Sequence, residues 1–383
     1  MLRHPGPDAR HDATACKAQG VSIVAPTYRE ADNLRALAMR IRTAMAAASL
    51  DWELILADDD SGDGSEELAL ELSRSLPVRF HARQARRRDL SQAVLDGIRQ
   101  ARFDRLIVMD ADLSHPPEQI AELLAALHGD AEMAVGSRYA PGGRIDGAWG
   151  RYRTLNSRIA TWLTRPLTRC ADPMSGFFAV DRHRLPEPDE LAPVGFKIGL
   201  EFMVRGGLRV REVPIRFDER HRGSSKLTWR QQLAFLRHLF RLYRHRFGLP
   251  VRLLSFGAVG ATGLVVDTAV YLGLQAVGLG HLLARFLSFW PAVTWNWRLN
   301  RVLTFDDRPP TRAVGQWTRF AVASTVGLAT NVGSYAALTS FVAPFMARPL
   351  LALFAGVAVG SAANFAVATH FVYRRRGADT DSE

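Results

Sequence analysis

Short apolar runs alternate with charged, amphipathic segments through the first 250 residues of the chain. Runs typical of short strands occupy 21–26, 53–60, 105–110 and 131–137. Apolar residues recur at helical spacing in the segments that follow the first three runs, 31–45, 65–76 and 116–128. Strands that alternate with helices predict βαβ units and a mostly parallel sheet, which is an α/β fold.

The pattern changes after Pro250, where long apolar stretches begin. Residues 253–280 carry one charge, Asp267, while 320–347 and 349–373 carry none. Each stretch exceeds the roughly 20 residues needed to cross a hydrocarbon core. A fourth, less apolar stretch at 281–297 is expected to return the chain across the membrane. The alternative, a soluble core, would require four helices almost without a charged face.

Positive charge is concentrated at one end of these stretches. Arginines precede the first, fill the loop between the second and third, and follow the fourth, whereas the two opposite loops share only Arg348. The positive-inside rule therefore predicts a multi-pass protein of the cell (inner) membrane with both termini and the soluble domain in the cytoplasm. Residues 1–20 lack a signal-peptide core, which fits this orientation. The net charge of +11 then indicates an anionic membrane surface and no nucleic acid.

Three strand-like runs end in polar clusters: "PTYRE" (26–30), "DDDSGDGS" (58–65) and "DADLSH" (110–115). Parallel sheets bind ligands at the carboxyl ends of their strands, so these clusters should meet at one edge. Asp110 and Asp112 can then hold a divalent cation together, and oxygen ligands suit Mg²⁺ or Mn²⁺. The two cysteines fit neither a metal spacing nor a disulfide framework.

Each cluster also has a structural interpretation. The second fits an acidic turn with Ser65 as a helix N-cap, and the third fits a turn with Pro117 at the first helical position. The first fits an ordinary loop. The second cannot be a calcium loop of the EF-hand type, because no glutamate stands twelfth from its first aspartate. Their common position at strand ends favours one shared site.

Motifs in both halves of the chain resemble known families. Residues 20 to 230 resemble the polyprenol-phosphate mannosyl- and glucosyltransferases, inverting family 2 enzymes related to dolichol-phosphate mannose synthase. The motifs that carry this resemblance are "VAPTYREADNL", "DDDSGDGS", "MDADLSHPPE", "GSRYAPGG", "DPMSGFFAVDR", "GFKIGLEFMVRG" and "VPIRFDERHRGSSKL". The apolar half resembles a GtrA-type membrane domain through "FGAVGATGLVVD" and "WNWRLNRVLTF".

The resemblance implies an order of domains. A disordered tail (1–19) would precede a GT-A, Rossmann-like domain (20–227). An amphipathic interface helix (228–249) would lead into a four-helix GtrA-like transmembrane domain (250–376) and a tail (377–383). Apolar spans of this kind also allow self-association into a homo-oligomer.

It also implies an activity and a set of site residues. A hexose, mannose before glucose, would move from GDP-mannose or UDP-glucose to a polyprenyl monophosphate, with Mg²⁺ or Mn²⁺ on Asp110 and Asp112. The catalytic residues would be Asp112, Arg138, Arg153 and Ser157. The substrate-binding residues would be Pro26, Tyr28, Glu30, Asp59, Asp60, Asp110, Ala111, Ser137, Asp172, Ser175 and Lys226. An acceptor phosphate is already charged, so arginines that position it can replace a general base.

The chain departs from the family pattern at several positions. Asp58 is an additional acid before the pair Asp59 and Asp60. Ser114 stands where the family usually has a glutamine that can join the metal shell. Asp89 and Ser91 stand where relatives often have glycines, a change that bears on donor choice or loop shape.

Residues 228–249 predict an amphipathic helix with an apolar stripe flanked by arginines. The stripe comprises Trp229, Leu233, Leu236, Phe240, Tyr243 and Phe247. Such a helix either lies in the headgroup layer or packs on its own domain. Polar residues inside the spans either bind lipid, help to move a product, or form interhelical hydrogen bonds. These residues are Asp267, Asn296, Asn331 and Asn364.

Two other classes of protein are alternatives to a polyprenyl-phosphate transferase. A processive family 2 transferase would carry a QxxRW box, whereas "TWRQQLAF" has related letters in the wrong order. A lipid-binding or lipid-translocating protein with an inactive transferase-like domain would not need the acids and arginines of the site. Asp110, Asp112, Arg138 and Arg153 are all present, which favours an active enzyme.

Overall fold

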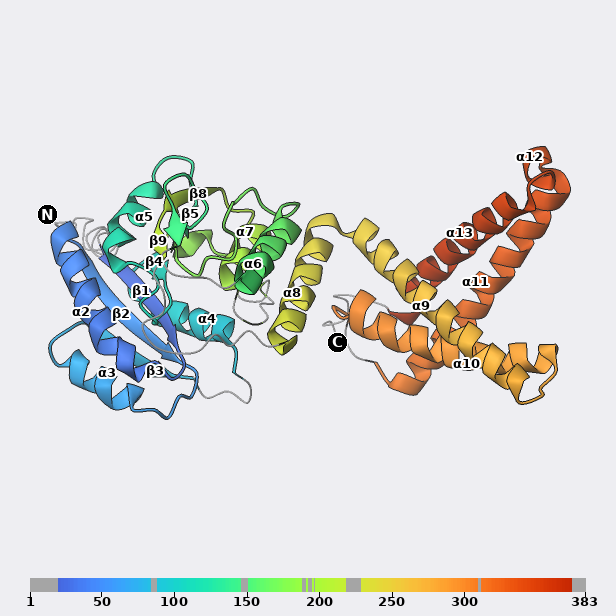
Figure 1. The fold of residues 1–383 in the computed structure, drawn as a ribbon, viewed down its shortest axis with the longest axis horizontal. Coiled ribbons are helices and arrows are strands. Elements are labelled where there is room, and N and C mark those ends of the chain that lie inside the picture. Colours follow the sequence, from blue (N-terminus) through green and yellow to red (C-terminus); the bar gives the residue numbers. More distant parts are fainter. Residues whose placement is uncertain are drawn as a thin grey trace, which may run out of the picture. The chain divides into compact units, whose positions relative to one another are not determined.

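The computed structural model describes residues 20–83, 88–145, 151–187, 191, 195, 197–217, 229–308 and 311–373. The chain divides into two compact units, Met1–Arg246 and Phe247–Glu383. The expected tails at 1–19 and 377–383 and the candidate Lys226 lie outside the described residues. Figure 1 shows an α/β unit and a separate, wholly helical unit.

The first unit is built on a seven-stranded sheet in the order β3-β2-β1-β4-β7-β5-β8. Its strands are β1 (Gly20–Thr27), β2 (Asp51–Asp58), β3 (Val78–Ala82), β4 (Arg105–Val108), β5 (Met133–Ser137), β7 (Phe178–Asp181) and β8 (Val210–Pro214). Every pairing is parallel except those that β7 makes with β4 and β5. The expectation of a mostly parallel α/β sheet is confirmed. A second sheet pairs β6 (Arg144–Ile145) with β9 (Arg216–Phe217).

Helices cover both faces of this sheet (Figure 1). The helices of this unit are α2 (Ala31–Ala48), α3 (Ser65–Ser73), α4 (Leu90–Gln100), α5 (Ile120–Ala126), α6 (Arg151–Thr164), α7 (Ile198–Arg205) and α8 (Trp229–Phe247), with short 3₁₀ turns at Pro117–Gln119 and Arg182–Arg184. Apolar residues of α2, α3 and α5 pack on one face, and those of α4 and α7 pack on the other. Because both faces are covered, the central strands are apolar at successive positions.

Strand pairing places the polar clusters along one edge. Thr27 at the end of β1 pairs with Asp58 at the end of β2, and Val24 pairs with Val108 of β4. Since β7 runs antiparallel, the segment that precedes it lies at the same edge as the end of β5. The edge therefore collects residues after β1, β2, β4 and β5 and residues before β7.

Helix α8 has one apolar face that is buried and another that is exposed. Phe235, Leu239 and Leu242 pack with apolar residues of α6 and α7, and the hydroxyl of Tyr243 donates a hydrogen bond to the carbonyl of Leu163 at 2.7 Å. A different face of the helix exposes four residues of the predicted stripe, namely Trp229, Leu233, Leu236 and Phe247. The helix thus packs on its own domain while keeping an exposed apolar surface.

The second unit contains two antiparallel helical hairpins. Helices α9 (Leu249–Ala276) and α10 (His281–Leu299) form one, and α11 (Ala313–Phe341), the short α12 (Ala343–Met346) and α13 (Pro349–Val367) form the other. π-Helical turns extend α10 to Thr304 and α13 to Val372. Among the described residues, two segments are long and apolar enough to cross a membrane, Leu249–Ala276 and Leu351–Val372. Spanning by α10 and α11 stays a prediction.

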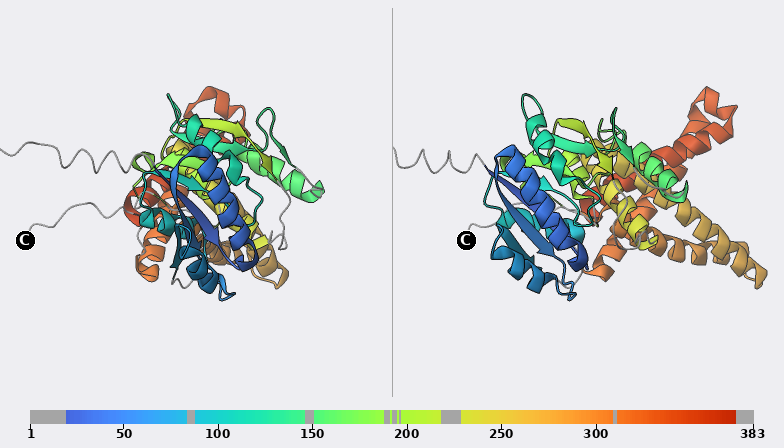
Figure 2. Two further views of the ribbon diagram at one scale, coloured as in Figure 1. Left: turned by 90° about the vertical axis from the view of Figure 1, so that its left-hand side faces the viewer. Right: turned by 60° about the vertical axis from the view of Figure 1, so that its left-hand side comes forward.

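Aromatic residues hold the two hairpins together at one end. Phe305 stacks on Tyr373 with ring centroids 4.2 Å apart, and Phe256 and Phe365 pack beside them. From this cluster the hairpins diverge, so that their turns lie well apart (Figures 1 and 2). The divergence leaves much of each hairpin's apolar surface exposed.

Three asparagines that were predicted to lie in the membrane, Asn296, Asn331 and Asn364, lie against glycines of neighbouring helices. A Cβ placed on Gly263 would stand 2.2 Å from Oδ1 of Asn296, and one on Gly360 would stand 2.6 Å from the Cβ of Asn331. Asn364 lies in the same way against Gly327. Small residues that admit a neighbour this closely are typical of helix packing in membranes. Among the expected roles, these contacts favour helix association.

Candidate active site

The clusters after β1 and β2 form one interlocked structure. The amide of Arg29 donates to Oγ of Ser61 at 2.9 Å, and the amide of Asp59 donates to the carbonyl of Thr27 at 3.0 Å. The expected residues Pro26, Tyr28 and Glu30 therefore stand beside Asp59 and Asp60. These residues lie close together because β1 and β2 are adjacent parallel strands, whose carboxyl ends lie at the same edge of the sheet.

The three successive acids of this turn have different roles. Asp58 is buried and accepts hydrogen bonds from the Thr27 hydroxyl (2.9 Å) and from the amide and hydroxyl of Ser61 (2.8 and 2.5 Å). The additional acid is thus an anchor of the turn. Asp60 is exposed and has φ of 60°, a left-handed conformation that favours glycine. Of the expected pair, Asp59 is the one held inside the site.

Protein donors fix both oxygens of Asp59. Its Oδ1 accepts from Nη1 of Arg83 at 2.9 Å, and its Oδ2 accepts from the amide of Asp89 at 2.7 Å. Asp89 in turn caps α4 by accepting from the amides of Ser91 and Gln92, and it also accepts from the amide of Gly195. Burial raises the pKa of the Asp89 carboxyl. Arg83 was not predicted from the sequence, and Asp89 was identified there only as a departure from the family pattern.

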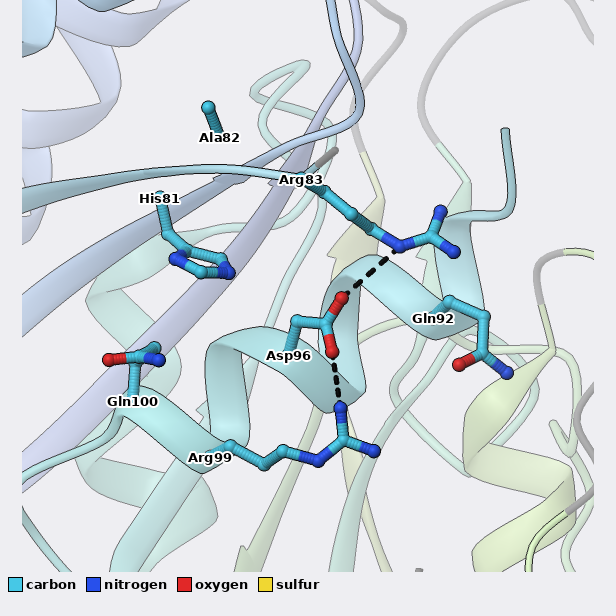
Figure 3. Close-up of a pocket in the computed structure, with 7 residues that line it drawn as sticks. All are labelled: His81, Ala82, Arg83, Gln92, Asp96, Arg99 and Gln100. Carbon is cyan, nitrogen blue, oxygen red and sulfur yellow. Dashed lines mark hydrogen bonds and ion pairs between the residues drawn. The ribbon is translucent and has the colours of Figure 1, made fainter. Parts of the chain in front are cut away.

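Arg83 connects Asp59 to a neighbouring pocket of about 590 Å³. Its Nε donates to Asp96 at 3.1 Å, and Asp96 pairs with Arg99 on the next turn of α4. Figure 3 shows this chain of ion pairs along the pocket, which is lined by His81, Ala82, Arg83, Gln92, Asp96, Arg99 and Gln100. The guanidinium of Arg88 lies 4.3 Å from the centroid of the Tyr28 ring.

The carboxylate pair follows β4, which ends two residues before Asp110. The amide of Asp110 donates to Nδ1 of His115 at 3.0 Å. Oδ1 of Asp112 accepts from the hydroxyl of Ser114 at 2.5 Å and from its amide at 3.1 Å. Leu113, with φ of 65°, turns the chain between Asp112 and Ser114, and Ala111 is buried. The turn therefore holds both acids by short local contacts.

The surroundings of this pair fit a hard divalent cation. Burial lowers the pKa of His115, so its ring is neutral at pH 7 and places no positive charge beside Asp110. Gly176 leaves this carboxylate room, because a Cβ there would stand 3.1 Å from its Oδ1. The described residues include no group of three His, Cys, Asp or Glu side chains close enough together to hold a metal ion without other ligands. Two carboxylates with substrate phosphates and water are a usual shell for Mg²⁺.

Arg138 and Asp172 form a buried pair. The backbone amide, Nε and Nη2 of Arg138 donate to the Asp172 carboxylate at 3.0, 2.7 and 2.7 Å. The amides of Ala171 and Asp172 donate to Glu212 of β8 at 2.9 and 3.2 Å. Glu212, which sequence reasoning missed, thus fixes the segment that holds Arg138.

The expected serines have protein partners. Ser137 is fully buried, and its hydroxyl accepts from the amides of Tyr139 and Ala140. The hydroxyl of Ser175 donates to the carbonyl of Gly136 at 2.7 Å. Ser157 on α6 lies 2.9 Å, Oγ to Oη, from Tyr139. Arg153 precedes Ser157 by four residues on α6, and its side chain lies outside the described residues.

Acidic clusters at the carboxyl edge of an α/β sheet, with a paired carboxylate and fixed arginines beside them, define a nucleotide-sugar glycosyltransferase site of GT-A type. Comparison with known families agrees. The glycosyl transferase family 2 model matches residues 22–183, and the GtrA/DPMS transmembrane domain model matches residues 255–378.

Curated relatives narrow the family. A dolichol-phosphate mannosyltransferase from Pyrococcus furiosus is 36% identical over 81% of this chain and 88% of its own length. A dolichol-phosphate mannosyltransferase from Mycosarcoma maydis is 42% identical over 59% of this chain and 80% of its own length. A polyprenol monophosphomannose synthase from Mycolicibacterium smegmatis is 34% identical over 56% of this chain and 84% of its own length.

The chain therefore belongs to glycosyl transferase family 2, in the group of the dolichol-phosphate mannosyltransferases, and it is a membrane protein. The resemblance seen in the motifs is confirmed for both halves. Among solved structures, glucosyl-3-phosphoglycerate synthase from Mycobacterium tuberculosis superposes with a TM-score of 0.46 at 17% identity, over 65% of this chain and 88% of its own length.

Proposed function

We propose that this protein is a membrane-bound inverting mannosyltransferase that moves mannose from GDP-mannose to a polyprenyl monophosphate. The similarity to the Pyrococcus furiosus enzyme carries the proposal, because it extends over 81% of this chain, the catalytic unit and the helical unit together. The product is a polyprenyl-phosphate mannose, an activated sugar for later glycosylation. UDP-glucose is the competing donor.

The donor lies along the edge formed by the ends of β1 and β2. Asp59 is held by Arg83 and the Asp89 amide, so its carboxylate presents a fixed acceptor to the N–H groups of a base or the hydroxyls of a ribose. Pro26, Tyr28 and Glu30 line the same edge. A carboxylate that is oriented before binding loses little conformational entropy when the nucleotide arrives.

Asp110 and Asp112 would hold a Mg²⁺ or Mn²⁺ ion, which would supply positive charge beside the diphosphate leaving group. The hydroxyl and amide of Ser114 orient Asp112 for this role. The chain also provides a compact, mostly buried setting for these acids, in which charge interactions are stronger than in water.

The acceptor phosphate is positioned by Arg138, Arg153 and Ser157. A phosphate oxygen attacks the anomeric carbon, and the bond from that carbon to the diphosphate oxygen breaks. The attacking oxygen already carries negative charge, so no side chain has to remove a proton. Orientation is the main contribution of the protein to this step. Asp172 occupies the Nε and Nη2 side of Arg138, which fixes the direction of the guanidinium.

Exposed apolar residues support a position at the membrane surface, and the arginine distribution predicts that this is the cytoplasmic surface of the cell membrane. On α6 the exposed residues Leu155, Ile159 and Trp162 recur at spacings of four and three, on the helix that also carries Ser157. Trp229, Leu233 and Leu236 of the α8 stripe are exposed on the same unit. Amphipathic helices of this kind lie in the headgroup layer, where a polyprenyl phosphate is found. Association of the membrane unit into oligomers stays a prediction.

The test is transfer by the purified protein in detergent with undecaprenyl phosphate and Mn²⁺ or Mg²⁺. Labelled GDP-mannose and UDP-glucose are offered in parallel, and Asp112→Asn is the inactive control. We expect mannose in the organic phase with the wild type and none with the variant. Transfer from UDP-glucose alone would overturn the choice of sugar, and transfer from neither would overturn the proposed reaction.

A further inference from the structure

The α9–α10 hairpin contains a charged pair that the transferase reaction does not use. Asp267 on α9 is 8% exposed, although it lies in an apolar helix of 28 residues. It accepts a hydrogen bond from the buried Ser288 hydroxyl at 2.7 Å and pairs with Nη1 of Arg285. Ionisable groups inside a membrane are costly, so an ionisable residue within a span is by default a candidate functional residue.

The pair continues a line of polar residues that runs to the hairpin turn. Tyr271 and Gln275 follow Asp267 at intervals of four on α9, and both contact Nδ1 of His281 at the start of α10, Tyr271 Oη at 3.0 Å. Arg285 follows His281 by four residues on α10. The half of this hairpin nearest the turn therefore carries a row of polar residues within an otherwise apolar surface.

The position of Arg285 matches the depth of lipid phosphates. At 1.5 Å per residue, the 28 residues of α9 extend for about 42 Å, close to the thickness of a bilayer with its headgroups. Arg285 lies four residues inside α10, or about 6 Å below the turn. That is the level at which the headgroup layer meets the hydrocarbon.

Arg285 is also held in an unusual direction. Arginines near the ends of spans normally extend toward water, but this one reaches inward to Asp267, deeper in the hairpin. Its side chain is 61% exposed, whereas that of Asp267 is 11% exposed. A pair that served only to join α9 and α10 would bury both partners. The remaining guanidinium donors, which have no other partner among the described residues, face the surroundings of the hairpin.

These surroundings are apolar. Leu272, Leu282 and Phe286 near the turn are all exposed, so lipid contacts this part of the hairpin. N–H donors at this depth need an acceptor, because an unsatisfied donor in hydrocarbon costs several kcal/mol. Arg285 is also the only Arg or Lys between residues 253 and 297. The planar fork of arginine suits a phosphate.

We propose that Arg285, oriented by Asp267, binds the phosphate of a lipid in the leaflet at the α9–α10 turn. This is the leaflet opposite the arginine-rich ends of the spans. His281, Gln275 and Tyr271 extend the site toward the headgroup. The site is separate from the acceptor site of the catalytic unit and does not depend on the proposed mannosyl transfer.

The test measures lipid retention by the full-length protein in detergent with native mass spectrometry. The probes are phosphatidylglycerol and, as a phosphate-free control, diacylglycerol with the same acyl chains. The main variant is Asp267→Asn/Arg285→Gln, which removes both charges and leaves neither one buried alone. Arg348→Gln is the matched control, because Arg348 lies at the turn end of the other hairpin.

We expect the double variant to retain phosphatidylglycerol at least about tenfold more weakly than the wild type, the loss expected of one charge-assisted hydrogen bond. Arg348→Gln should retain it as the wild type does, and diacylglycerol should not distinguish the proteins. Melting temperatures show whether the double variant is folded. Equal retention by a folded double variant would overturn the site, and displacement of the lipid by inorganic phosphate would overturn its assignment to a lipid.

Discussion

The hydroxyl of Ser114 donates to Oδ1 of Asp112 across 2.5 Å, and the Ser114 amide donates to the same oxygen at 3.1 Å. Two donors on one oxygen fix the rotation of a carboxylate that is 4% exposed. Ser114 thus orients a proposed metal ligand. Its role is to position Asp112.

Ser114→Ala should therefore weaken cation binding. Loss of a hydrogen bond to a charged group predicts roughly a tenfold rise in the Mn²⁺ concentration needed for half-maximal GDP binding. Titration calorimetry with GDP at a series of Mn²⁺ concentrations measures this. Ser73→Ala, on the exposed end of α3, is the control and should behave as the wild type. An unchanged Mn²⁺ dependence in Ser114→Ala would show that the hydroxyl does not orient the ligand.

Asp172→Asn tests the orientation of Arg138. An amide cannot accept both Nε and Nη2 as the carboxylate does, so Arg138 loses its fixed direction. We expect the KM for polyprenyl phosphate to rise by roughly tenfold, with the KM for GDP-mannose nearly unchanged. Steady-state kinetics with each substrate varied in turn separates the two constants. Removing one partner of a buried ion pair also costs roughly 3–5 kcal/mol of stability, so the variant should melt at a lower temperature.

Asp181→Asn, at the end of β7, serves as the control for that experiment, because its side chain is not part of the pair. A rise in both KM values to the same extent in Asp172→Asn would indicate a general structural loss. A rise confined to GDP-mannose would place Arg138 on the donor side of the site.

Arg83→Gln and Arg99→Gln make a matched pair along the chain of ion pairs in Figure 3. The Arg83 side chain is 14% exposed and contacts Asp59, so its loss leaves a buried acid without its cation. We expect GDP affinity to fall by at least roughly tenfold. Arg99 is half exposed, and exposed ion pairs contribute about 0–1 kcal/mol, so its loss should change GDP affinity little. Equal effects of the two changes would contradict the proposed role of Arg83.

Local sequence patterns were sufficient to predict the elements that carry the donor site. Apolar runs and polar strand ends located β1, β2 and β4, and the placement of Asp59, Asp110 and Asp112 followed from parallel pairing. Uncharged stretches likewise located the long helices of the membrane unit. In each case the signal lies within about 20 neighbouring residues.

Partners that are distant in sequence were not predictable in this way. Glu212 is 40 residues from Asp172, and they meet only because β7 is inserted antiparallel between β4 and β5. The apolar periodicity of a single segment does not indicate where its strand is inserted in the sheet. Arg83 was missed because it follows β3, a strand that was not predicted from the sequence, and it is 24 residues from Asp59. The stripe of α8 was predicted, but its buried side was not, because the packing partners lie on α6 and α7.

Asp89 offers a prediction about pH. Burial raises the pKa of this carboxyl above its ordinary value of 3.8, so the folded chain binds this proton more tightly than the unfolded chain does. The contribution of Asp89 to stability is therefore largest at low pH and declines as pH rises from about 3.8 through the raised pKa.

The variant Asp89→Asn tests this prediction. Its asparagine still caps α4, because asparagine is an equally good N-cap, and it has no proton to lose. The melting temperature of the wild type minus that of Asp89→Asn should fall as pH rises from about 4 to 7, while carboxylates common to both proteins cancel. Circular dichroism of the two full-length proteins in the same detergent measures this difference, and a difference that grows with pH would show that the hydrogen bonds from Ser91, Gln92 and Gly195 outweigh burial.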